Sequence, residues 1–157
     1  MSITSRRFPR VPLNVPAAVK LEEVHLACRL LQLGQGGALM EFSVKQPLPE
    51  RFTLSFELPG AVPMTVQAAA RFRRERGGYR PNSALPTMGC QFLGLTEPLR
   101  VAIAAFVARQ REALRQLQFS LALTPPPPRA SLLVKQVGAS ELSASELQQF
   151  VRWCAST

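Results

Sequence analysis

The stretch from residue 62 to residue 73 reads VPMTVQAAARFR, and it alternates apolar and polar side chains along most of its length. Successive side chains of a β-strand point to opposite faces of the sheet, so this pattern predicts a strand with one buried face. The other face includes Gln67, Arg71 and Arg73, and is therefore polar and basic. The residues predicted to face the core are Val62, Met64, Val66, Ala68, Ala70 and Phe72.

Five further segments repeat this alternation, and turn signals lie between them. Glycine or proline residues, which allow or force non-strand backbone angles, occur within residues 34–37, 47–49, 59–60 and 77–86. Short alternating segments joined by such turns are typical of a β-barrel or a sandwich. Residues 73–86 are predicted to form a long hairpin loop that carries Arg73, Arg74, Arg76 and Arg80. The five strands are predicted at residues 13–21, 25–33, 38–42, 52–58 and 88–92.

The period changes from two to the three- and four-residue steps of a helix after Thr96. Thr96 suits the N-cap position, and an apolar stripe then continues to Leu117. The proline run at residues 125–128 cannot continue a helix, so it predicts a semi-rigid spacer. The short helix predicted after it must dock on this barrel or on a partner, because it is too short to be stable alone. We therefore divide the chain into residues 1–118, a barrel with its helix, and residues 119–157, a spacer with a short C-terminal helix.

The composition is that of a folded domain, with 157 residues of which 46% are hydrophobic and 18% charged. The longest run without a polar residue, Val101 to Ala108, is far shorter than the roughly 20 residues of a membrane-spanning helix. The first ten residues contain no apolar core of a secretory signal, so we expect a cytoplasmic protein. Cys28, Cys90 and Cys154 are odd in number and widely spaced, which predicts reduced thiols rather than a disulfide framework or a zinc site.

The sequence contains no pattern that is typical of an enzyme. His25 is the only histidine, so no second histidine completes a metal site with it. The GQGG segment at residues 34–37 lacks the lysine of a phosphate-binding P-loop. Serine, histidine and acidic residues form no recognisable nucleophile arrangement. We therefore predict a non-enzymatic domain that uses neither a metal nor a cofactor.

The 19 basic and 10 acidic residues give a formal net charge of +9, which favours an anionic partner. Arg6, Arg7 and Arg10 stand immediately before the first predicted strand. Arginine binds phosphate oxygens through paired hydrogen bonds, and its planar face stacks on nucleobases. If this segment folds across the mouth of the barrel, these side chains close on a ligand held by the glycine-rich turn at residues 34–37. The alternative is a basic tail surrounded by solvent.

The order of these motifs resembles the PilZ domain family. An RRxxR segment at residues 6–10 leads into an alternating strand, LQLGQGGALME follows at residues 31–41, and GCQFLGL at residues 89–95 precedes the amphipathic helix. The resemblance covers roughly residues 5–118, and it implies a six-stranded antiparallel β-barrel with a C-terminal α-helix. It also implies a receptor for the bacterial second messenger cyclic di-GMP, in which Arg6, Arg7 and Arg10 bind phosphate and stack on guanine.

The second ligand-binding motif of the family reads Asp or Asn, any residue, Ser, any two residues, Gly, and it falls here on residues 32–37. Gly37 matches this motif, whereas Gln32 offers an amide without a carboxylate charge and Gly34 has no hydroxyl. Each lost contact costs on the order of 1–3 kcal/mol. Gln35 or an arginine of residues 73–80 is a candidate to compensate. The ligand-binding residues expected are Arg6, Arg7, Arg10, Gln32, Gly34, Gln35 and Gly37.

The resemblance leaves two functions open. In the first, cyclic di-GMP orders the N-terminal arm and thereby changes the surface that an unidentified protein effector binds. In the second, a degenerate PilZ-like adaptor does not bind cyclic di-GMP and acts through protein contacts, by family analogy in motility or pilus assembly. Nucleic-acid binding is disfavoured, because Trp153 and Tyr79 are the only Trp and Tyr available to stack on bases.

Overall fold

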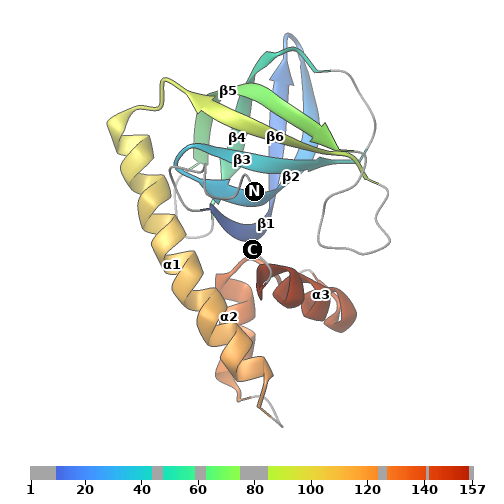
Figure 1. Cartoon of the computed structure of the whole chain (residues 1–157), viewed down its shortest axis with the longest axis vertical. Helices are drawn as coiled ribbons and strands as arrows, with labels where there is room; N and C mark the ends of the chain where they lie inside the picture. Colours follow the sequence, from blue (N-terminus) through green and yellow to red (C-terminus); the bar gives the residue numbers. More distant parts are fainter. Residues whose placement is uncertain are drawn as a thin grey trace.

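Six antiparallel strands close into a barrel in the order β1-β2-β3-β6-β5-β4 (Figure 1). The computed structural model describes residues 10–43, 48–58, 63–74, 85–123, 127–140 and 142–155. β4 pairs with both β1 and β5, which closes the sheet, so the predicted six-stranded antiparallel barrel is confirmed. The strands are β1 (Arg10–Leu21), β2 (Val24–Gly34), β3 (Gly37–Phe42), β4 (Arg51–Glu57), β5 (Pro63–Arg74) and β6 (Thr87–Leu93).

Alternate residues of each strand form the barrel core, as the period of two predicts. Leu13, Leu54 and Met88 are among its fully buried members. Helix α1 (Glu97–Leu121) adds Ile103 and Phe106 from its first half to the same core. The N-cap of this helix is Thr96, as predicted. The barrel and the start of α1 thus share one hydrophobic interior.

The second half of α1 continues past the barrel and forms a second hydrophobic core with α2 (Arg129–Gln136) and α3 (Ala144–Ala155) (Figure 1). Phe150 of α3 is completely buried there, together with Leu117 of α1 and Leu133 of α2. Leu31 of β2 and Leu39 of β3 contribute from the outer face of the sheet. The sequence left open whether the terminal helix docks on the barrel or on a partner. The structure shows that this helix packs on its own chain.

Helix α2 is absent from the sequence prediction, which gives residues 119–157 only a spacer and one short helix. Pro128 takes the N-cap position of α2, so the helix begins directly after the proline run. Ala130, Leu133 and Val137 are buried at the helical spacing of three and four residues, which is the signal for this helix. The predicted boundary between residues 118 and 119 falls inside α1. The division into two domains stays a prediction.

Phe72 is predicted to face the barrel core, and this prediction is wrong. The pairing of β5 with β6 shifts register between Ala70 and Phe72, so one extra residue enters β5 at this point. A β-bulge of this kind interrupts the strict alternation of faces. The ring of Phe72 lies against Gly89 on the outer face of the sheet and is 38% exposed.

Gln110 lies within the apolar stripe of α1 and is almost completely buried. Its side-chain amide donates one hydrogen bond to the carbonyl oxygen of Pro12 in β1 at 3.0 Å and another to that of Val137 at the end of α2 at 3.1 Å. A buried carbonyl oxygen without a donor is energetically costly, so this amide satisfies two acceptors at once. Gln110 therefore ties the start of the barrel to the helical layer.

The thiols of Cys28 and Cys90 are free and buried in the barrel. Burial raises the pKa of Cys28 to about 12 and that of Cys90 to about 11. At about pH 8 we therefore expect an aromatic disulfide reagent to modify both thiols far more slowly in the folded chain than in the chain unfolded in urea. The measurement uses the Cys154→Ser variant, which lacks the third thiol.

The raised pKa values of these two thiols also make the free energy of unfolding depend on pH. The folded chain keeps these thiols protonated at pH values where the unfolded chain loses the protons, so the free energy of unfolding should fall as the pH rises above about 9. Urea titrations at a series of pH values measure this slope. In the thiol-modification experiment, rapid reaction of both thiols in the folded chain at about pH 8 would contradict their burial.

Candidate functional site

Arg10 is the one residue of the predicted arginine cluster that lies within the described residues. It begins β1 and stands opposite Gly34, the last residue of β2, in the antiparallel pairing. Its guanidinium reaches β3, where Nη2 is 3.2 Å from the position that a Cβ on Gly37 would occupy. Because Gly34 carries no side chain, the long Arg10 side chain can extend across the end of β2 to the β2–β3 turn.

Gly37 is required by the close approach of two neighbours. A Cβ at this position would collide with the backbone carbonyl oxygen of Cys90 in β6 and would also crowd the Arg10 guanidinium. The adjacent backbone is fixed by the hydrogen bond from the Phe92 amide to the Gly36 carbonyl oxygen at 2.9 Å. Glycine at residue 37 thus allows β3, β6 and Arg10 to meet at one point.

The pKa of the Cys90 thiol is affected by its burial and by these neighbours. Burial raises the pKa of its thiol, while the hydrogen bond with the backbone of Ala38 and the positive charge of Arg10 oppose that rise. The Arg10 guanidinium lies beside Gly37, close to β6, and a cation there stabilises a nearby thiolate. Arg10 is a half-buried residue, and its guanidinium lies beside the glycine-rich turn.

Gln32 is on the same outer face as Arg10 but is almost completely buried. Its pairing partners are Pro12 in β1 and Leu39 in β3. Leu39 and the preceding residue, Leu31, both belong to the second hydrophobic core. Gln32 therefore stands at the junction between the glycine-rich turn and the helical layer, whereas Gln35 lies half-exposed in the turn itself.

Arg6 and Arg7 fall outside the described residues, and so do Arg76 and Arg80 of the predicted long loop. The structure brings together Arg10, Gly34 and Gly37 from the predicted site. It puts Gln32 under the edge of the helical layer, which the sequence did not indicate.

A partly buried polar pair, Asn14 of β1 and Arg29 of β2, has a structural role. Asn14 lies where the β1–β2 pairing shifts register, and it is almost completely buried. Arg29 of β2 donates from Nε to the Asn14 side-chain oxygen and from Nη2 to the Asn14 carbonyl oxygen at 3.3 Å. Since a bulge leaves backbone groups outside the regular ladder, Arg29 supplies the donor that the ladder does not. Sequence alone gave no signal for this pair.

The described part of the chain holds no group of three or more histidine, cysteine or acidic side chains placed to bind a metal. His25 is exposed near the start of β2. None of the helices in the described ranges is long and apolar enough to cross a membrane.

Comparison with known proteins connects this geometry to a family. The sequence pattern of the PilZ domain matches residues 4–109. No curated protein matches the chain. Among solved structures, the PilZ domain of Escherichia coli YcgR with c-di-GMP is similar, with a TM-score of 0.59, 20% identity and coverage of 71% of this chain and 95% of that one.

Two longer proteins share the fold as well. Escherichia coli YcgR in complex with c-di-GMP has a TM-score of 0.58 and 18% identity over 71% of this chain and 48% of that one. The Bacillus subtilis inhibitor of motility, MotI/DgrA, has a TM-score of 0.59 and 14% identity over 68% of this chain and 51% of that one. This chain thus spans about half the length of both proteins. With the family pattern matched over most of its length and the same barrel, the chain belongs to the PilZ domain family.

Proposed function

We propose that this PilZ domain is a regulatory receptor for cyclic di-GMP. The observation that carries the proposal is the Arg10 guanidinium, which lies beside Gly37 at the outer mouth of the β2–β3 turn. Guanidinium groups bind phosphate oxygens in pairs and stack on bases, and cyclic di-GMP offers both phosphate and guanine. Two of the similar solved structures contain c-di-GMP, which supports this ligand class.

The proposed binding surface is the outer face of β1, β2 and β3 at the end marked by Arg10. Gly34 and Gly37 are buried, and the Arg10 guanidinium lies against Gly37, while Gln35 in the turn between them supplies a half-exposed amide. Arg6 and Arg7 precede β1 by a few residues and are proposed to complete the arginine side of the site. Because a bacterial second messenger acts inside the cell, the proposal implies a cytoplasmic chain that needs neither metal nor enzymatic activity.

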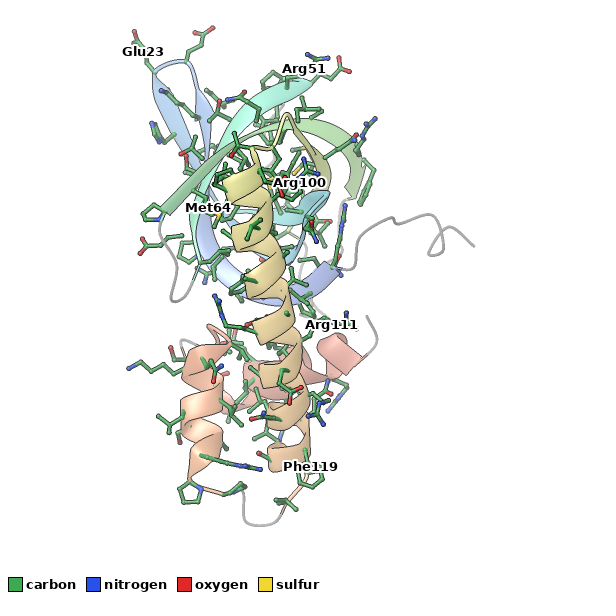
Figure 2. The ribbon with its side chains drawn as sticks, turned by 90° about the vertical axis from the view of Figure 1, so that its left-hand side faces the viewer. Glu23, Arg51, Met64, Arg100, Arg111 and Phe119 are labelled. Carbon is green, nitrogen blue, oxygen red and sulfur yellow. The ribbon has the colours of Figure 1, made fainter. Side chains whose placement is uncertain are left out.

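Isothermal titration of the full chain with cyclic di-GMP tests this function. We expect Arg10→Ala to weaken binding by about tenfold to a hundredfold, because hydrogen bonds to charged groups contribute about 1.5–3 kcal/mol. Arg51→Ala is the matched control, since Arg51 is an exposed arginine at the start of β4, near the top of the barrel in Figure 2. Two strands separate β4 from β3 in either direction around the barrel. The receptor function is ruled out if the unaltered chain gives no heat at high micromolar ligand.

The second candidate is an adaptor that does not bind cyclic di-GMP and acts through protein contacts. The burial of Gln32 and the missing hydroxyl at Gly34 favour it, because both reduce the polar groups that a guanine base can reach. One similar structure is an inhibitor of motility, which supports a motility partner by analogy. In cells, full function of Arg10→Ala together with loss of function when residues 124–157 are removed would favour the adaptor.

A further inference from the structure

A groove runs between the end of α1 and α3 on the side of the helical layer. Its volume is about 570 Å³, and Leu121, Leu147 and Val151 form its apolar floor. These three side chains are only partly buried and lie at the edge of the second core. The groove therefore presents apolar surface that the described residues do not cover completely.

The rim of this groove is polar and basic. Gln118 of α1 and both Gln148 and Arg152 of α3 line it. Arg111 precedes Gln118 by seven residues, which is close to two helical turns, so it extends the same face of α1. Figure 2 shows Arg111 on the side of α1 where α3 lies. Exposed arginines thus stand on both helices that border the groove.

The acidic residues of these two helices are Glu97, Glu112 and Glu146, and none of them lines the groove. Glu146, the only acidic residue of α3, exchanges hydrogen bonds with Ser143 at the start of the helix, at 3.2 Å in each direction. Glu112 lies on another face of α1, where it binds Arg115 and Gln116. The formal net charge of the whole chain is +9. The electrostatic potential at the groove therefore favours an acidic occupant.

We propose that the α1–α3 groove binds an amphipathic helix of a partner protein, with leucine-type side chains on one face and acidic residues along its edges. The apolar floor matches a stripe of such side chains at helical spacing, and the arginines match the acidic edges. From Ala144 to Arg152 the groove follows α3 for about 12 Å, which is two turns or slightly more. The partner helix needs only a few turns of contact.

This surface goes beyond the proposed receptor function and does not depend on it. The groove-lining residues Leu147 and Val151 are on α3, and Phe150 of the same helix packs in the core that includes Leu31 and Leu39. The partner surface exists whether or not cyclic di-GMP binds.

The probe is a fluorescein-labelled helical peptide of about 16 residues, with leucines at positions i, i+3, i+4 and i+7 and glutamates beside them. Fluorescence anisotropy with the full chain, without cyclic di-GMP and at about 150 mM salt, measures binding. A peptide of the same composition with its leucines scattered around the helix is the negative control. The variants are Arg111→Glu combined with Arg152→Glu, and the matched control Arg109→Glu, an exposed arginine on the other face of α1.

We expect the amphipathic acidic peptide to bind and the scattered peptide not to bind. The double charge reversal should weaken binding about tenfold, whereas Arg109→Glu should leave the affinity within about twofold of that of the unaltered chain. A peptide with lysines in place of the glutamates should bind the double variant better than it binds the unaltered chain. NMR amide shifts should centre on Gln118 and Leu147. The proposal is overturned if the acidic peptide does not bind, if the scattered peptide binds equally well, or if duplex DNA binds this face at the same salt and displaces the peptide.

Cyclic di-GMP is added in a separate titration, which keeps the two proposals distinguishable. Peptide binding without any response to cyclic di-GMP supports the groove and rejects the receptor function. Cyclic di-GMP binding without peptide binding supports the receptor function and rejects the groove.

Discussion

Phe150→Ala is expected to release α3 from the barrel while the barrel itself remains folded. Phe150 is fully buried in the second core, where it packs with residues from α1, α2 and the outer face of β2 and β3. Replacing a buried phenylalanine by alanine costs about 3–5 kcal/mol. A helix as short as α3 is unstable by itself and depends on this packing, so a loss of this size is expected to undock it.

Hydrogen exchange measures this release directly. Amides of α3 and of the end of α2 should lose protection in Phe150→Ala, while amides of β1 and β4 keep theirs. Leu132→Ala is the matched control, because Leu132 is a large apolar residue on α2 that is 70% exposed, and its truncation should change stability by less than about 0.5 kcal/mol. Uniform loss of protection through barrel and helices would instead mean that the two cores unfold as one unit.

The same variant tests whether the helical layer supports the proposed ligand site. Leu31 precedes Gln32 in β2, and Leu39 is paired with Gln32 across the β2–β3 ladder. When α3 leaves, the core that includes both leucines loses Phe150, while α1 keeps its contacts with β2. We therefore expect the affinity for cyclic di-GMP to change in Phe150→Ala, in contrast to Leu132→Ala, and isothermal titration of both variants measures the difference.

Gly37→Val is expected to disrupt both the barrel and the proposed binding of cyclic di-GMP. Any Cβ at residue 37 meets the backbone carbonyl oxygen of Cys90, which cannot move without separating β3 from β6. Overpacking of this kind costs about 1–3 kcal/mol, and valine adds two further methyl groups next to the Arg10 guanidinium. The unfolding midpoint should fall, and the heat of ligand binding should disappear.

Gly89→Ala is the control for this substitution. Gly89 lies on β6, and a Cβ there would meet the Phe72 ring rather than backbone. Because Phe72 is partly exposed, its ring can turn aside, so this variant should lose much less stability than Gly37→Ala. If urea titration shows equal losses for Gly37→Ala and Gly89→Ala, the contact between β3 and β6 at Gly37 is not the cause.

The sequence determined the six strands because alternation is a local property of the chain, whereas alternation alone left a barrel or a sandwich open, and the barrel was implied by the resemblance to the PilZ domain family. Each strand shows its buried face through residues two positions apart, and the helix after Thr96 shows its own through steps of three and four. The RRxxR segment and the glycine-rich turn were recognisable for the same reason, since each is a short continuous stretch. These features are set by neighbouring residues and need no knowledge of distant contacts.

Tertiary structure decided the features that depend on pairs of distant residues. The bulge that turns Phe72 outward depends on the register between β5 and β6, which alternation within β5 does not reveal. Gln32 is buried beside Leu31 and Leu39, which belong to a core formed with α1, α2 and α3, and these helices are distant from β2 in the sequence. The Arg10 guanidinium lies beside Gly37 and Cys90 only because β1, β2, β3 and β6 are consecutive strands of a closed barrel, and no stretch of sequence contains that adjacency.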